Sequence, residues 1–492
     1  MRKCIAGEKL RLLWRFLKVG CVLLLVTMVT YVSRELWYRH TPKTVTRKPL
    51  VQETEVDYGC LYTVLKPVGV SKTWQTLSLI IRRTTNPTQC LKIESKINTT
   101  VTNFLPGAST FRVQAFGSRE MATGSVRHLG NDTYNATVRL TFEDEYIIMI
   151  IITYVNNASL EFRSHVRPIL QHVRGSPMDI KVALGVSPLD YTRYCTQKEA
   201  GTKPGRWVEC GSINGIENCG PWQMDPVYEF DQIHGFHWLP YDCQLHHYTD
   251  QEIKKCFAKN SWKEIVFTGD SHMRYRTYHW VTRLYGACHG CIKTHIKMVF
   301  DKIPRIEWMF DARGTRWPIS FKNISLPNEL YVHPKTRRSM FSKEFPQSLF
   351  DGNLFMLNFG HWVLRESTYI QFAKSKLRAY VKAIKTLNRT GDPRRFIWIN
   401  TVSLPWRQDK AVEEWLENPS PSRVAQWNEI SDRVMKENGV QIVDAFQISN
   451  SRIGATHDQT HYAKRFDRGY CGGVVENAIS NTIANALCNF DI

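Results

Sequence analysis

The chain has 492 residues, of which 43% are hydrophobic, and this is enough to bury at least one large core. Its formal net charge is +20, but eleven Lys and Arg residues lie within the first 50 positions, against two acidic residues. Because much of the basic charge surrounds one short segment, the composition argues against nucleic acid as a partner, while the moderately basic remainder would tolerate an acidic glycan.

Residues 1–33 have the pattern of a membrane anchor. Six basic residues precede an uncharged apolar stretch from Val19 to Val32, and no small-x-small cleavage site follows. The stretch is short for a membrane span and has the length of a signal-peptide core, so a secreted protein is the alternative. We expect an uncleaved type II anchor in the Golgi membrane, with a cytoplasmic tail over 1–18, a transmembrane helix over 19–33 and a luminal body.

Sequons and cysteines support a luminal body. Eleven cysteines follow the predicted anchor, and in an oxidising lumen most of them would form disulfides. Cys288-His-Gly-Cys291 has a spacing found in zinc sites, but no second CxxC supplies the other ligands, so we expect a disulfide there and no metal site. The six N-x-S/T sequons begin at Asn98, Asn131, Asn135, Asn157, Asn323 and Asn388.

The next part of the chain is predicted to be a stem followed by a β domain. Residues 34–57 are polar and basic, without apolar periodicity, which is typical of a stem. Over 58–170, alternating or continuously apolar runs of strand length are separated by Gly and Asn/Asp clusters. This pattern predicts an antiparallel β-sandwich, loosely similar to immunoglobulin or filamin repeats, with Cys60 and Cys90 as an expected disulfide.

Helix and strand patterns alternate over residues 176–492. Thr249 and Glu252 have the spacing of a capping box, and an apolar helical face runs over 273–284. Strands are predicted at 265–267, 354–360, 395–402 and 440–446, and helices near 366–386, near 422–437 and at the C-terminus. The alternation predicts an α/β domain with a mostly parallel sheet and helices on both faces. In such sheets, sites form at the carboxyl ends of strands.

Ser271, in the segment IVFTGDSHMR, stands between a predicted strand and a predicted helix. A hydroxyl at such a turn is suited to nucleophilic attack, because the free N–H groups and positive end of the helix favour a nearby oxyanion. Ser and Asp are also preferred helix caps, so the motif alone leaves both interpretations open.

A serine nucleophile requires a base and a group that orients the base. Two Asp-x-x-His patterns are present, Asp231/His234 and Asp458/His461. The first precedes the sheet, whereas the second follows the last predicted strand and should therefore reach the same sheet edge as Ser271. We predict that His461 accepts the proton of Ser271 and that Asp458 holds the imidazole; the alternative is an ordinary surface or core histidine.

Asn358 ends the predicted strand in LNFGHW. Its side-chain amide could donate to an oxyanion together with the N–H of Ser271, and one such donor is typically worth about 10²–10³ in rate. A glycine N–H would complete this site, but the pattern does not identify which one. The alternative role for Asn358 is a loop cap.

These motifs together resemble those of SGNH/GDSL-type hydrolases, and more specifically the PC-esterase group. That group includes the plant trichome-birefringence-like polysaccharide O-acetyltransferases and the animal neurexophilin/PC-esterase (NXPE) proteins. The plant motifs GDSxxRN, NTGHWW and DxxHW are similar to GDSHMRY, NFGHWV and DQTHY here, with Tyr275, Val363 and Tyr462 as departures. A β-sandwich before the catalytic domain is similar to the NXPE arrangement, and the resemblance covers roughly residues 195–490.

The resemblance implies a three-layer SGNH-like domain over 176–492 that transfers an acetyl group to a glycan or glycoprotein through an acyl-serine. It implies no bound cofactor; the acetyl donor is a co-substrate, with acetyl-CoA as one candidate. An esterase on the same fold and a non-catalytic NXPE-like adhesion or ligand protein are the alternatives. Beside Ser271, His461, Asp458 and Asn358, the matched motifs add Gly269, Asp270, Arg274, His361 and Trp362 as oxyanion- or substrate-binding candidates.

Overall fold

The computed structural model describes residues 58–70, 76–84, 109–155, 169–183, 193–212, 235–260, 262, 264–285, 292–293, 297–300, 305–310, 353–366, 377–378, 380–382, 384–385, 395–404, 420–456, 458, 460–465 and 471–488. The predicted tail, anchor and stem lie outside these residues. No helix in the described part of the chain is both long and apolar enough to cross a membrane. The single transmembrane helix of the predicted fold class, over 19–33, is one of the segments outside the described residues.

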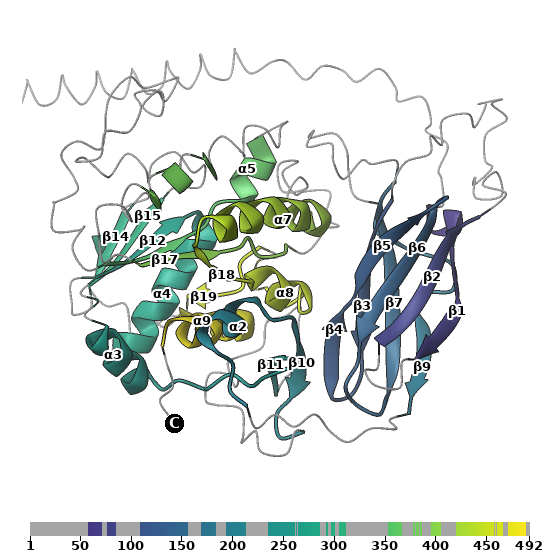
Figure 1. Cartoon of the computed structure of the whole chain (residues 1–492), viewed down its shortest axis with the longest axis horizontal. Coiled ribbons are helices and arrows are strands. Elements are labelled where there is room, and N and C mark those ends of the chain that lie inside the picture. The colour runs from purple at the N-terminus through teal and green to yellow at the C-terminus, as the bar shows by residue number, and fades with distance from the viewer. Residues whose placement is uncertain are drawn as a thin grey trace, which may run out of the picture. The chain divides into compact units, whose positions relative to one another are not determined.

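Two antiparallel sheets pack face to face in the first part of the described chain (Figure 1). The first has the order β1-β2-β6-β5, with β1 (Tyr62–Val70), β2 (Thr76–Arg83), β5 (Ser125–Gly130) and β6 (Thr133–Arg139), preceded by the 3-10 helix η1 (Tyr58–Leu61). Buried and part-buried side chains alternate along β2 and β6, so one face of each strand is apolar. The apolar faces of β2 and β6 contribute to the core of the sandwich, as the alternating sequence pattern predicts.

The second sheet of the sandwich has the order β11-β10-β4-β3-β7-β8, and a further strand, β9, also pairs with β7. Its strands are β3 (Thr110–Phe116), β4 (Glu120–Thr123), β7 (Asp144–Tyr154), β8 (Gln171–His172), β9 (Met178–Val182), β10 (Gly205–Glu209) and β11 (Phe236–Pro240). Val113 and Ile150 of this sheet pack against Leu79 and Ala136 of the first sheet. The sandwich core is therefore built from both sheets.

A third, mixed sheet has the order β13-β14-β15-β12-β16-β17-β18. Its strands are β12 (Glu264–Gly269), β13 (Ile292–Lys293), β14 (Lys297–Phe300), β15 (Arg305–Phe310), β16 (Asn353–Leu357), β17 (Arg395–Ile399) and β18 (Gln441–Val443). The prediction of a mostly parallel sheet is wrong. Antiparallel pairing dominates the described sheets, and among the named strands parallel pairing is confined to the run from β15 to β18 in this one. β13, β14 and β15 pair antiparallel, which short connections permit.

Helices cover both faces of the mixed sheet (Figure 1). They are α2 (Gln197–Thr202), α3 (Asp250–Lys259), α4 (Ser271–Tyr285), α5 (His361–Glu366), α7 (Pro421–Glu437), α8 (Ala445–Asn450) and α9 (Val474–Leu487). On one face, α3, α4 and α9 pack on the sheet, as Trp280 does with Ile265 in one core cluster. On the other face, Trp427 of α7 belongs to a second cluster with Phe355. A two-stranded sheet, β19 (Lys464–Arg465) with β20 (Cys471–Gly472), lies between α8 and α9 in the sequence.

Several local predictions are confirmed. The capping box of Thr249 and Glu252 begins α3, because the threonine hydroxyl accepts the backbone N–H of Glu252 while its carboxylate accepts the N–H of Thr249. The helical faces predicted over 273–284 and 422–437 correspond to α4 and α7, and the C-terminal helix to α9. The four predicted strands correspond to β12, β16, β17 and β18.

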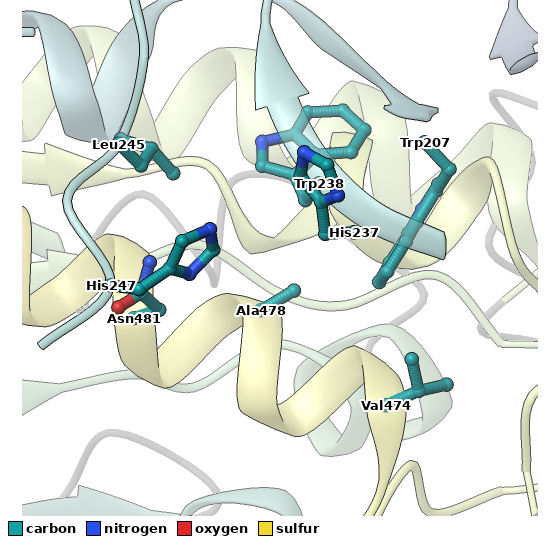
Figure 2. A pocket seen from close by; sticks show the side chains of 8 residues that line it. All are labelled: Trp207, His237, Trp238, Leu245, His247, Val474, Ala478 and Asn481. Carbon is teal, nitrogen blue, oxygen red and sulfur yellow. The ribbon is translucent and has the colours of Figure 1, made fainter. Parts of the chain in front are cut away.

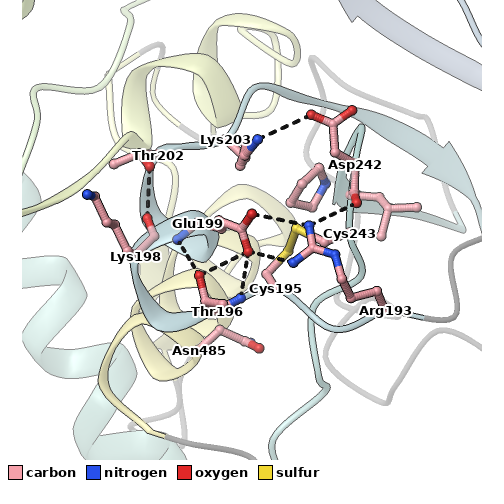
Figure 3. The surroundings of a disulfide bond; sticks show 12 residues. Arg193, Cys195, Thr196, Lys198, Glu199, Thr202, Lys203, Asp242, Cys243 and Asn485 are labelled. Atoms are coloured by element: carbon pink, nitrogen blue, oxygen red, sulfur yellow. Dashed lines mark hydrogen bonds and ion pairs between the residues drawn. A yellow bond between two sulfur atoms is a disulfide. The ribbon is translucent and has the colours of Figure 1, made fainter.

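Two disulfides join segments that are distant in sequence. Cys195 pairs with Cys243 beside α2, where Arg193 also forms an ion pair with Glu199 at 2.7 Å (Figure 3). Cys256 of α3 pairs with Cys488 at the end of α9, 232 positions away. Cys60 is also disulfide-bonded, and its predicted partner, Cys90, lies outside the described residues.

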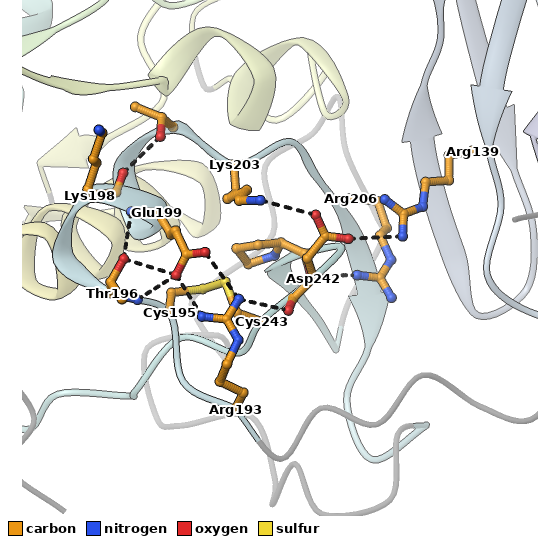
Figure 4. Close-up of polar contacts among 12 residues, drawn as sticks. Arg139, Arg193, Cys195, Thr196, Lys198, Glu199, Lys203, Arg206, Asp242 and Cys243 are labelled. Atoms are coloured by element: carbon orange, nitrogen blue, oxygen red, sulfur yellow. Dashed lines mark hydrogen bonds and ion pairs between the residues drawn. A yellow bond between two sulfur atoms is a disulfide. The ribbon is translucent and has the colours of Figure 1, made fainter.

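The sandwich and the α/β part are physically continuous. β10 and β11 belong to the segment that leads into the α/β part, yet β10 pairs with β4 and so extends a sandwich sheet. Charged contacts follow the same junction (Figure 4): Asp242 lies 3.1 Å from Arg139 of β6 and 3.5 Å from Lys203. The buried Arg206 of β10 donates to the carbonyl of Pro240 at 2.9 Å. Residues 56–91 and 97–492 accordingly cluster as one unit.

Candidate active site

The GDS turn begins α4 in a way that frees the serine hydroxyl. The carboxylate of Asp270 accepts the backbone N–H of His272 at 2.9 Å, and the carbonyl of Asp270 accepts the N–H of Arg274 at 3.1 Å. Asp270 therefore performs the capping role at the helix start. Gly269 has no room for a side chain, since a Cβ there would lie 2.7 Å from the carbonyl oxygen of Asn358. Ser271 is left free for other partners.

Ser271, His461 and Asp458 form a hydrogen-bonded relay. The Nδ1 atom of His461 lies 2.7 Å from Oδ2 of Asp458, and its Nε2 atom lies 2.8 Å from Oγ of Ser271. A carboxylate only accepts hydrogen bonds, so Nδ1 carries the hydrogen and Nε2 offers its lone pair to the serine hydroxyl. This arrangement can remove the hydroxyl proton and leave a nucleophilic oxygen.

A tight local turn fixes the carboxylate of Asp458. Its Oδ1 atom accepts the backbone N–H groups of Thr460 at 2.9 Å and of His461 at 2.7 Å, which leaves Oδ2 directed at the imidazole. Such bonds from Asp to nearby backbone N–H groups are a common turn-forming pattern. The side chain of Asp458 is 38% exposed, whereas that of His461 is 15% exposed. The turn, rather than burial, therefore holds the aspartate in place.

The side chain of Asn358 is engaged by the protein. Its amide nitrogen donates to the carbonyl of Ile399 at 2.7 Å and to the hydroxyl of Thr401 at 3.3 Å. These bonds join the end of β16 to the end of β17 and use both amide hydrogens. The predicted oxyanion role of Asn358 gains no support from this geometry, because the amide has no hydrogen left for a substrate.

His361 connects three neighbouring loops at the carboxyl edge of the mixed sheet. Its Nε2 atom donates to the carbonyl of Val402 after β17 at 2.8 Å, and its Nδ1 atom lies 3.4 Å from Oδ2 of Asp270 after β12. Both Asp270 and His361 are buried. Burial alone would raise the pKa of Asp270, but the contact with His361, the electrostatic interactions with the neighbouring imidazoles and the backbone N–H of His272 outweigh burial, so the pKa falls below its usual range. Asp270 is an anion, and His361 is a positioning residue of the turn.

Three aromatic residues at the site were not anticipated in these roles. The rings of His272 and Tyr275 lie 4.9 Å and 4.6 Å from the ring of His461, respectively. Tyr462, which follows His461, donates its hydroxyl to the carbonyl of Ser403 at 2.8 Å. Tyr275 and Tyr462 are two of the departures from the plant motifs; Tyr275 contacts the imidazole, and Tyr462 anchors the residue next to it. Their positions next to the motif residues were the only signal in the sequence.

Hydrogen bonds connect the β-sandwich to Tyr462, the residue next to His461. Arg112 and Gln114 of β3 donate to the carbonyl of Asn450 at 3.1 Å and 3.3 Å. The side-chain oxygen of Asn450 accepts the hydroxyl of Ser403 at 3.0 Å, and Ser403 in turn accepts Tyr462. A chain of hydrogen bonds therefore runs from the sandwich to the residue beside His461.

The remaining candidates have less defined roles. Arg274 and Trp362 are half-buried, and the guanidinium of Arg274 lies 5.5 Å from the ring of Tyr275. The alternative pair, Asp231 and His234, lies outside the described residues, as does Cys288-His-Gly-Cys291. No cluster of His, Cys, Asp or Glu suited to a metal ion exists among the residues that the structure describes.

A small cavity lies away from the relay, between β10, β11 and α9 (Figure 2). It has room for about one water molecule. Burial lowers the pKa of His237 to about 3 and that of His247 to about 4, so both lining imidazoles are neutral. The cavity is too small for a substrate, and the relay is the better candidate. The residues that line the cavity are Trp207, His237, Trp238, Leu245, His247, Val474, Ala478 and Asn481.

No family model matches the chain, and no curated protein matches its sequence. The similarity to the PC-esterase group therefore depends on the motifs quoted above and on the geometry of their residues.

Proposed function

We propose that the protein is an O-acyltransferase that moves an acetyl group to a sugar hydroxyl through an acyl-serine intermediate. The observation that carries this proposal is the relay from Ser271 through His461 to Asp458, with consecutive contacts of 2.8 Å and 2.7 Å. Groups within hydrogen-bonding reach in this order are the signature of an activated nucleophile.

In the first half-reaction, His461 takes the proton of Ser271 while the serine oxygen attacks the acetyl carbonyl carbon. The tetrahedral adduct collapses, the bond to the donor's leaving group breaks, and His461 returns the proton to that group. In the second half-reaction, a sugar hydroxyl gives its proton to His461 and attacks the acetyl-serine. Ser271 leaves with the proton, so both the hydroxyl and the base are restored.

The same residues would support hydrolysis if water replaced the sugar, so an esterase is the second candidate. Two half-buried aromatic residues are compatible with a sugar acceptor: Tyr275 beside His461 and Trp362 next to His361 are of the residue types that stack on sugars. The disulfides support an oxidising compartment of the secretory pathway. The charge surplus is compatible with an acidic glycan.

The test is an assay of the full chain with acetyl-CoA or an aryl acetate as donor and a panel of sugars as acceptors. Acetylated sugar indicates transfer, and free acetate alone indicates hydrolysis. Ser271→Ala should abolish either product, whereas Ser125→Ala, on the exposed strand β5, should leave it unchanged. Equal product from Ser271→Ala and the wild type would exclude both enzymatic functions.

A further inference from the structure

The proposed reaction places negative charge on the carbonyl oxygen beside Ser271, and that oxygen requires hydrogen-bond donors. Several nearby donors are already used. The amide of Asn358 donates to Ile399 and Thr401, and the backbone N–H groups of His272 and Arg274 both donate to Asp270. A donor from another source is therefore needed in addition to the N–H of Ser271.

The side chain of His272 is in the right place. His272 follows Ser271 directly in the chain, and its ring lies 4.5 Å from that of His361 and 4.9 Å from that of His461. Only 8% of the residue is exposed. No described group forms a hydrogen bond with either ring nitrogen. An imidazole in this state is available to a ligand beside Ser271.

We propose that His272 is a catalytic residue whose ring N–H donates to the oxyanion that forms when Ser271 attacks the acyl group. This inference rests on the proposed function. It assigns to His272 the donor role that the sequence pattern suggested for Asn358.

The electrostatic surroundings suit this role. Burial, followed by the electrostatic effect of His361, lowers the pKa of His272 well below its usual value. His461 and Arg276, which also face the ring, lower this pKa too, and Asp270 only partly opposes the effect. A neutral imidazole has one N–H and one lone pair, so His272 retains a donor throughout the working pH range. Because it stays neutral, it does not compete with His461 as the base.

The test compares three substitutions in the full chain. His272→Ala removes the donor and should lower kcat by about 10²–10³-fold while KM changes by no more than about threefold. His272→Asn and His272→Gln place an amide N–H near the positions of Nδ1 and Nε2, and the one that recovers part of kcat identifies the donating nitrogen. The matched control is His279→Gln, because His279 is a buried histidine on the same helix. Thermal unfolding of each variant shows whether it is folded.

A second measurement targets the oxyanion itself. An alkyl boronic acid that forms a tetrahedral adduct with Ser271 should bind His272→Ala at least about tenfold more weakly, while the acid limb of the pH profile stays in place. If His272→Ala keeps wild-type kcat and boronate affinity, the inference is overturned and the proposed function stands. If the wild type neither turns over an acetyl ester nor binds the boronate in a manner that depends on Ser271, both are overturned.

Discussion

Nε2 of His461 lies 2.8 Å from Oγ of Ser271, although the two residues are 190 positions apart in the chain. Ser271 follows β12 in the middle of the mixed sheet, and His461 lies beyond α8, in the loop after the last strand of that sheet. Convergence at the carboxyl edge of the strands is what the proposed chemistry requires. Each partner is held by a different aspartate: Asp270 caps the helix that begins at Ser271, and Asp458 binds the imidazole of His461.

Asp458→Asn should lower kcat by about 10²–10⁴-fold, because an amide at this position no longer favours the tautomer with hydrogen on Nδ1. Asp458→Ala should be similarly impaired. The measurement is kcat as a function of pH with an aryl acetate as donor. Substitution of Asp231, the other Asp-x-x-His aspartate, serves as the control. Wild-type activity in Asp458→Asn would remove Asp458 from the relay.

Arg112→Met should lower kcat by about 10–100-fold with little change in KM, because the shorter of the two bonds to the carbonyl of Asn450 is lost and the imidazole shifts relative to Ser271. Burial lowers the pKa of Arg112 only to about 10, so the lost group is a cation at neutral pH. Met retains the apolar length of the side chain.

The control for Arg112→Met is Arg127→Met, since Arg127 is exposed on β5 of the same sandwich. Arg112→Lys should recover part of kcat. If Arg112→Met lost thermal stability but kept full kcat, the sandwich would support the fold without positioning the base.

Stability should fall as the pH rises from about 4 to about 7. Desolvation, followed by repulsion from Asp444, raises the pKa of Asp432 to about 7 in the folded state. The native state therefore binds more protons than the unfolded chain over this window, and the free energy of unfolding decreases with rising pH. Denaturant unfolding at several pH values should show a loss that is smaller by at least about 1 kcal/mol in Asp432→Asn than in the wild type. An equal slope in both proteins would contradict the assignment.

Gly360→Ala should destabilise the protein by about 1–3 kcal/mol and lower activity, because the added Cβ would overlap the side chain of Thr401. Thr401 also accepts from Asn358, so the clash would displace the loop after β17. Unfolding in denaturant measures the loss, and the double variant Gly360→Ala/Thr401→Ala should recover part of it. If Gly360→Ala is as stable as the wild type, the packing at this turn is looser than described.

The relay could be predicted because its signals are local. GDS after an apolar run indicates a strand-to-helix turn, and Asp-x-x-His places a carboxylate within reach of an imidazole on one turn. The direction of the Asn358 amide could not be predicted, because its acceptors, Ile399 and Thr401, are more than 40 positions away. For the same reason, the role proposed for His272 could not be predicted, because it depends on long-range contacts of the ring with His361 and His461.

The sheet arrangement was harder to predict than the elements. Strands such as β12 and β16 have apolar sequences that identify them in isolation. The pairing of β10 with β4 depends on long-range register, whereas β14 and β15 pair antiparallel across a short connection; neither segment alternates with helices. A rule based on alternating helices and strands therefore overestimated parallel pairing.

The most direct test of the central claim is to capture the acyl-enzyme. The full chain is mixed with an aryl acetate, quenched in acid within the first turnover and digested, and the peptide that contains Ser271 is examined by mass spectrometry. We expect an acetyl adduct on Ser271 that is lost on addition of a sugar acceptor and is absent in His461→Ala. Release of acetate with no adduct on Ser271, or the same adduct in His461→Ala, would contradict the account.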